Sequence, residues 1–104
     1  MYVQNTVTKQ VVTKEDEDGK IVMTARKLGK VVSLEFIITI KTSPEEMPLL
    51  SFDNMIPVEY RPNQFLKIIG EEACTSLNIN PEGKVIVLNA TTEVSNVVFT
   101  YIKD

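Results

Sequence analysis

The sequence predicts an all-β domain, folded as an antiparallel sandwich or barrel. Valine, isoleucine and threonine recur with a period of two residues in short runs along the chain. Turns that contain glycine, proline or asparagine separate these runs. Runs at this spacing, about eight in number, are typical of small antiparallel β proteins. With 104 residues, the chain is long enough to bury one hydrophobic core.

The first half of the chain holds the clearest strands. Residues 10–14 and 20–26 are predicted to form a hairpin, because an acidic turn that ends in Gly19 joins them. Residues 30–41 follow a second glycine turn and form the strongest predicted strand. Alternate apolar residues make up its expected core face: Val32, Leu34, Phe36, Ile38 and Ile40.

The pattern is irregular between residues 42 and 62. Residues 43–46 resemble a helix start, with a capping serine, a proline and two acids, but Pro48 limits the helix to one turn. Residues 49–52 are a short strand candidate. Residues 56–62 are predicted to be an extended loop, since prolines stand near both of its ends.

Regular alternation returns in the last third of the chain. Strands are predicted at residues 64–69, 73–79 and 84–89, with a tight turn at 80–83 that has proline and glycine at its second and fourth positions. The final predicted strand, residues 96–102, is apolar on both faces. Val97, Phe99 and Tyr101 lie on one face, and Val98, Thr100 and Ile102 lie on the other.

The residue types required for catalysis are missing or isolated. The chain contains no histidine, and therefore lacks the commonest general base and the commonest nitrogen ligand for metals. The lone Cys74 is expected to be a buried apolar side chain. The acidic pairs at 45–46 and 71–72 and the acidic run 15–18 are interpreted as solvated, because so small a sandwich cannot build a deep cleft. We predict a binding domain that is not an enzyme, with no metal site and no cofactor.

Charge and hydropathy exclude two classes of partner. The net charge is −3 and the eleven basic residues are spread along the chain, which argues against nucleic acid. No apolar run approaches the ~20 residues that a membrane helix requires, so no membrane insertion is expected.

Two predicted strands carry large aliphatic side chains on the face opposite the core. Val31 and Ile37 lie on one of them, and Val98 and Ile102 on the other. A strand face in contact with water is usually polar, so these residues indicate a second buried surface. An oligomer interface between identical copies would bury them. A further sheet of the same domain is the alternative.

Four motifs occur in a fixed order in residues 29–104. They are the run Gly29-Lys30-Val31-Val32-Ser33-Leu34-Glu35-Phe36, the corner Ile56-Pro57-Val58-Glu59-Tyr60-Arg61-Pro62, the hairpin Leu77-Asn78-Ile79-Asn80-Pro81-Glu82-Gly83-Lys84-Val85, and the ending Thr100-Tyr101-Ile102. This segment resembles the receptor-binding head domain of tail-fibre and baseplate proteins from phages of Gram-positive bacteria. The corner is close to that family's frequent Leu-Pro-x-Gly-Tyr-Arg-Pro, although Glu59 replaces the glycine.

The resemblance implies a homotrimeric, jelly-roll-like β-sandwich at the tip or baseplate of a phage tail, made in the host cytoplasm. Its expected partners are host cell-wall saccharide (polysaccharide or teichoic acid), identical copies of the chain and other tail or baseplate proteins. Residues 1–28 lie outside the resemblance and are expected to be extra strands or a neck remnant packed on the head. A non-binding trimerisation or capping domain, or a carbohydrate-binding module of an enzyme, remains the alternative.

Candidate ligand-binding residues gather around the corner. Saccharide sites combine aromatic rings with side chains that hydrogen-bond to hydroxyls. Tyr60 and Arg61 have a second interpretation, in which they only lock the corner. The full candidate set is Asp53, Asn54, Glu59, Tyr60, Arg61, Asn63 and Gln64.

Overall fold

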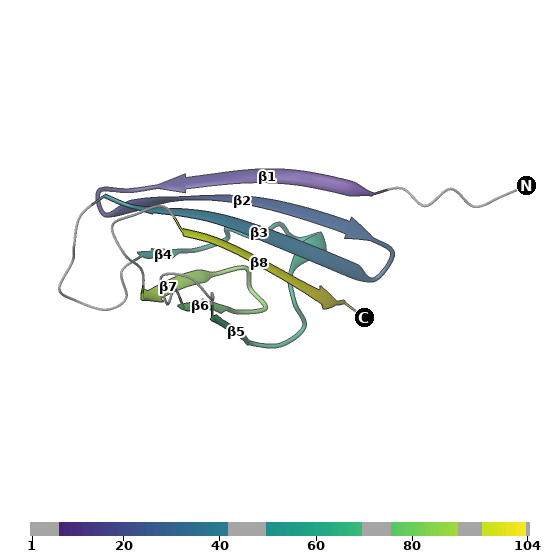
Figure 1. The fold of residues 1–104 in the computed structure, drawn as a ribbon. Helices are drawn as coiled ribbons and strands as arrows, with labels where there is room; N and C mark the ends of the chain where they lie inside the picture. Colours follow the sequence, from purple (N-terminus) through teal and green to yellow (C-terminus); the bar gives the residue numbers. More distant parts are fainter. Residues whose placement is uncertain (1–6, 42–49, 70–75, 90–94, 104) are drawn as a thin grey trace, which may run out of the picture.

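The computed structural model describes residues 7–41, 50–69, 76–89 and 95–103, which form two antiparallel four-stranded sheets (Figure 1). The all-β class is therefore confirmed. Sheet A has the strand order β1-β2-β3-β8, with β1 (Thr8–Glu15), β2 (Gly19–Leu28), β3 (Val31–Ile40) and β8 (Ser95–Ile102). Sheet B has the order β4-β7-β6-β5, with β4 (Leu50–Phe52), β5 (Leu66–Ile69), β6 (Ser76–Ile79) and β7 (Val85–Asn89).

The long strands of sheet A lie where the alternation predicts them. β1 and β2 form the expected hairpin, in which Val12 is opposite Met23. β2 continues the sheet onto β3, with Met23 opposite Phe36. The two strands of the segment 1–28 therefore belong to the same sheet as β3.

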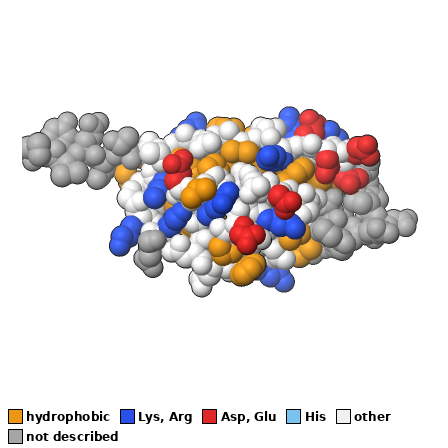
Figure 2. All heavy atoms as spheres, turned by 180° about the vertical axis from the view of Figure 1, so that it is seen from behind, with side chains coloured by type: hydrophobic (Ala, Val, Ile, Leu, Met, Phe, Trp, Pro, Cys, Tyr) orange, Lys and Arg blue, Asp and Glu red, His pale blue; other side chains and the backbone are white. Residues whose placement is uncertain are grey.

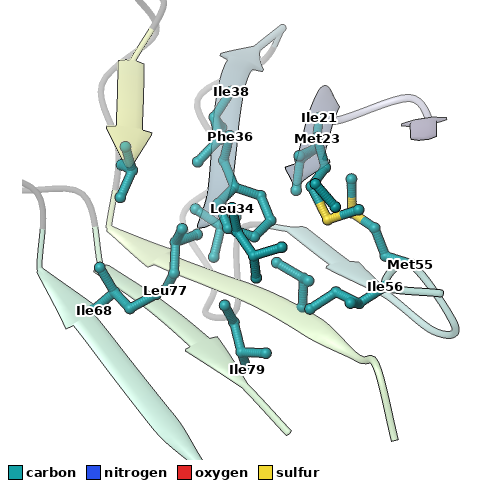
Figure 3. Close-up of a cluster of buried hydrophobic side chains, with 14 of the residues drawn as sticks. Ile21, Met23, Leu34, Phe36, Ile38, Met55, Ile56, Ile68, Leu77 and Ile79 are labelled. Atoms are coloured by element: carbon teal, nitrogen blue, oxygen red, sulfur yellow. The ribbon is translucent and has the colours of Figure 1, made fainter. Parts of the chain in front are cut away.

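The inner faces of the two sheets enclose the hydrophobic core. Phe36 and Leu34 of β3 point toward Leu77 and Ile79 of β6 in the middle of the sandwich (Figure 3). The predicted core face of β3 is confirmed, since its five apolar residues are all buried. On the outer face, Val31 and Ile37 of β3 are exposed, so a one-residue change of register would expose the core.

The prediction for the corner between β4 and β5 is wrong at one point. Residues 56–62 were expected to be extended, but Val58–Tyr60 forms a 3-10 turn, η1. The Tyr60 N–H donates to the Pro57 carbonyl at 2.9 Å and the Arg61 N–H donates to the Val58 carbonyl at 3.3 Å. Pro57, with φ of −58°, has the backbone angle that suits the start of such a turn.

Several predicted features lie outside the described residues. These are the helical turn at 43–46, the first part of the strand predicted at 73–79, Cys74 and the acidic pair at 71–72. In the part of the chain that the structure describes, no helix is long and apolar enough to cross a membrane. No three described acidic side chains gather in a group that could hold a metal ion.

The β6–β7 turn supports the corner through Gly83. Its carbonyl accepts hydrogen bonds from the N–H groups of Met55 and Ile56, at 2.9 and 3.1 Å. Gly83 has φ of +88°, and a Cβ atom there would lie 2.6 Å from Arg61 Nε and 2.7 Å from the Ile56 carbonyl oxygen. Both the backbone angle and the close approach therefore require glycine.

We expect Gly83→Ala to lower the free energy of unfolding by about 2–4 kcal/mol, because it combines an unfavourable positive φ with steric overlap. Gly29→Ala is the matched control, since Gly29 has φ of +60° but no atom within 4 Å of the added methyl group. The control should lose only about 1–2 kcal/mol. Urea denaturation of both variants measures the difference, and equal losses would contradict the role assigned to the close approach.

Candidate functional site

Tyr60 is a structural residue of the corner. Its side chain is only 1% exposed, and its hydroxyl donates to Thr8 Oγ1 at 3.1 Å. Its carbonyl accepts a hydrogen bond from the Tyr101 hydroxyl. Burial raises the pKa of Tyr101, which keeps that hydroxyl protonated and able to donate. A buried ring that joins β1 and β8 cannot contact a ligand, so the geometry favours the locking role for Tyr60.

Arg61 is fixed by the corner itself and by the β6–β7 turn. Its Nε donates to the Ile56 carbonyl at 2.7 Å, and its guanidinium lies directly over Gly83. The side chain is half-buried. The hydrogen bond to the Ile56 carbonyl uses Nε and neither of the two terminal amino groups of the guanidinium.

A small hollow follows the corner directly. It has a volume of about 230 Å³ and lies where the segment 62–66 passes the end of β8. We call it the amide hollow, because Asn63 and Gln64 supply its polar groups. Its lining consists of Pro62, Asn63, Gln64, Leu66, Tyr101 and Ile102.

A larger groove lies on sheet B beside the hollow, with Leu66 shared by both. We call it the sheet B groove; its volume is about 390 Å³ and its walls are mainly apolar. Phe65 is 79% exposed at its edge, so one face of an aromatic ring is open to a ligand. The other lining residues are Lys67, Asn78, Ile79, Asn80, Lys84 and Ile86.

The structure brings together only part of the predicted ligand set. Asn63 and Gln64 line one hollow. Asp53 adjoins the sheet B groove, because its Oδ1 lies 3.7 Å from Lys84 Nζ. Asn54, with φ of 52°, is in the turn after β4, and Glu59 is an exposed residue of η1; neither lines the hollow or the groove.

Sequence reasoning missed Phe65 and the groove. A signal was available, because Phe65 and Ile69 both lie on the strand face opposite Ile68, whose side chain is buried. The same two-sided pattern singled out Val31 and Ile37. The groove residues from β6 and β7 had no such signal, because only the pairing of these strands with β5 and with each other places Asn78 between Lys67 and Ile86.

The four residues predicted for an oligomer interface share one surface. Val31, Ile37, Val98 and Ile102 are exposed on the outer face of sheet A, where Val31 and Ile102 are directly opposite each other. Leu28 and Val11 are exposed on the same face. No other described element of this chain covers these side chains.

The chemistry available in the hollow and groove is that of non-covalent binding. Amides can donate and accept hydrogen bonds, an exposed ring can stack, and Lys67 and Lys84 supply positive charge at the groove. Comparison of the chain with protein-family models and with curated proteins finds no match.

Proposed function

We propose that this chain is the receptor-binding head of a phage tail-fibre or baseplate protein, which attaches to saccharide on the host cell surface. The observation that carries the proposal is the continuous surface formed by the amide hollow, Leu66 and the exposed Phe65 ring. Amide groups pair with sugar hydroxyls, and aromatic rings pack against the apolar faces of sugar rings.

The size of this surface suits weak binding at each site. The amide hollow, at about 230 Å³, is smaller than a typical ligand pocket, and Phe65 is the one aromatic side chain in the groove lining. A head of this kind gains avidity when several copies engage a repetitive surface polymer together. Wall polysaccharide and teichoic acid are repetitive polymers of the required kind.

The strand pairing supports a jelly-roll-like arrangement. β3 pairs with β8, β4 with β7 and β5 with β6, so the second part of the chain folds back on itself as nested pairs. Jelly rolls arise from antiparallel strands that are folded together in this way. β1 and β2 extend one edge of sheet A beyond the nested pairs.

The outer face of sheet A supports the homotrimer. Its exposed aliphatic side chains come from four neighbouring strands, and a surface of that kind is normally buried against a partner. Packing of identical faces around a symmetry axis would cover them. The trimer would then attach to other tail or baseplate proteins within the virion.

We expect Phe65→Ala to weaken binding to isolated host cell-wall glycan about fivefold, since an aromatic contact contributes about 1 kcal/mol. Asn63→Ala/Gln64→Ala should have an effect of similar size, because each lost hydrogen bond contributes about 0.5–1.5 kcal/mol. Val58→Ala is the control, since Val58 is exposed and lies outside the hollow and the groove. Calorimetric titration gives the affinities.

One result would contradict the binding function, and another would contradict the proposed site. Fluorescently labelled protein that decorates no candidate host cell would remove the basis of the claim and favour a structural capping domain. Equal affinities for Phe65→Ala, Val58→Ala and the original protein would place the saccharide elsewhere on the surface.

Light scattering on the purified chain is expected to give three times its monomer mass. Val31→Lys/Ile102→Lys should yield a folded monomer, because both side chains are exposed in the single chain but would bury unpaired charges in the interface. Val58→Lys/Ile69→Lys, on exposed residues away from that face, should remain trimeric. If the original protein is a monomer, the receptor-binding head and the trimeric capping domain are both excluded, and a carbohydrate-binding module is favoured.

A further inference from the structure

The amide hollow and the sheet B groove adjoin each other but are built on different parts of the chain. The segment that follows the corner supplies the amides of the hollow, Asn63 and Gln64. The β6–β7 turn supplies Asn80 and Lys84 to the groove. Leu66 belongs to both linings, and its strand pairs with β6. Beyond this pairing, the relative position of the two depressions depends on what connects the corner to the β6–β7 turn.

Internal hydrogen bonds make the β6–β7 turn a firm wall of the groove. The Asn80 side-chain oxygen accepts from the N–H groups of Glu82 and Lys84, at 3.0 and 2.9 Å. The Asn80 carbonyl accepts from the Gly83 N–H at 3.0 Å, and the Asn80 N–H donates to the Lys84 carbonyl at 3.1 Å. A turn held in this way moves as a unit, so a shift of Gly83 would carry Asn80 and Lys84 with it.

Arg61 connects this turn to the corner. Its guanidinium packs on the Gly83 backbone, since a Cβ atom at Gly83 would lie 2.6 Å from Nε and 3.1 Å from Cζ. The same Nε donates to the Ile56 carbonyl at 2.7 Å. The Gly83 carbonyl accepts from the Ile56 N–H at 3.1 Å. Arg61, Ile56 and Gly83 therefore form a three-way contact between the corner and the turn.

Arg61 is also the residue from which the hollow begins. Pro62 follows it directly, is buried and lines the hollow, and the exposed Asn63 and Gln64 come next. A proline fixes its own φ and restricts the backbone of the residue before it. The direction in which Asn63 and Gln64 leave the corner is therefore set at Arg61, and a displacement of Arg61 would move the amides of the hollow.

The shape of the guanidinium suits this position better than that of an ammonium group. A guanidinium is planar, so it can lie flat on a glycine backbone while its N–H points in a fixed direction. A lysine could still donate to the Ile56 carbonyl, but its flexible chain and compact ammonium would leave the space over Gly83 poorly filled. Position 61 therefore depends on the geometry of arginine and not only on its charge.

We propose that Arg61 is a positioning residue, which holds the amide hollow and the sheet B groove in a fixed relation so that both bind one extended saccharide across Leu66. Arg61 lines neither depression, and it acts through Gly83 on one side and Pro62 on the other. Linked sugar units gain from a fixed spacing, because the second unit binds within the complex that the first has formed. The saccharide part rests on the proposed function; the structural coupling of the two depressions does not.

Amide NMR spectra of Arg61→Lys test the coupling without a ligand. We expect the signals of residues 63–64 and those of residues 80–84 to shift together, while the rest of the spectrum shows a folded protein. The physical reason is that the contact over Gly83 is lost while the charge is retained. Shifts confined to residues 63–64 would overturn the coupling.

Lys41→Arg is the matched control, because it also exchanges one basic residue for another that donates to a backbone carbonyl. Lys41 Nζ donates to the Asp16 carbonyl at 3.3 Å, at the end of sheet A far from the corner. Figure 2 shows the acidic side chains that gather at this end, opposite the N-terminal trace. The control should leave the signals of residues 63–64 and 80–84 unchanged, and equal shifts in both variants would overturn the role of Arg61.

Calorimetric titration with fragments of host cell-wall glycan tests the effect on binding. Arg61→Lys should weaken the binding of fragments with several sugar units about fivefold, because only these ligands need both depressions. Single sugar units should lose less than about twofold. A merely structural role for Arg61 would lower the stability and leave the affinity of the folded protein unchanged, and that result would overturn the proposal.

A double-mutant cycle measures the coupling directly. Phe65→Ala changes the groove, and Asn63→Ala/Gln64→Ala changes the hollow. In the original protein the combined change should weaken binding about threefold less than the product of the separate effects, since the two depressions share one ligand. In the Arg61→Lys background this deviation should disappear, and an equal deviation in both backgrounds would overturn the inference.

The two levels of the argument fail separately. If long fragments bind and Arg61→Lys does not alter their affinity, the inference is overturned and the proposed function stands. If the NMR signals of both depressions shift together but no fragment binds, the proposed function and the saccharide part of the inference are overturned.

Discussion

A set of hydrogen bonds around residues 55–62 connects the two sheets. The amide hollow and the sheet B groove both depend on it. The Gly83 carbonyl in sheet B accepts from the N–H groups of Met55 and Ile56. Tyr60 joins Thr8 of β1 to Tyr101 of β8, and these are the two edge strands of sheet A. Each bond contributes only about 1 kcal/mol, but together they hold a loop against partners that are far away in the sequence. The segment that follows the corner begins from a fixed point, which places Asn63, Gln64 and Phe65 on the surface.

The corner also explains why polar and charged groups accumulate beside it. The corner joins two strands of sheet B through residues that belong to neither sheet, so its carbonyl groups are not paired by strands and need donors from side chains. Arg61 supplies one for Ile56, and Lys103 supplies one for Val58. Two cations are thus fixed in a small region by the hydrogen-bond requirements of the backbone.

The two outer faces of the sandwich have different characters. Sheet A exposes aliphatic side chains from β1, β2, β3 and β8 over a broad sheet surface, which is suited to another protein surface. Sheet B exposes Phe65 beside a groove with amides and lysines, which is suited to a smaller polar ligand. Ile102 belongs to the outer face of sheet A and also lines the amide hollow. Self-association through sheet A would therefore lie close to the hollow.

The sequence by itself determined the class of fold and which side of each long strand faces the core. Alternation along β3 and β8 is a local property, because successive side chains of a strand point to opposite faces whatever the strand packs against. The roles of Tyr60, Arg61 and Phe65 were decided only by the tertiary structure. Tyr60 is buried because Thr8 and Tyr101 lie beside it, and Arg61 is fixed because Gly83 leaves room for its guanidinium. The hydrogen bond from Lys103 to the Val58 carbonyl likewise joins residues that are far apart in the sequence, and only the tertiary structure brings them together. Contacts between residues so far apart leave no periodic signal in a single sequence, and this is why half of the candidate site escaped prediction.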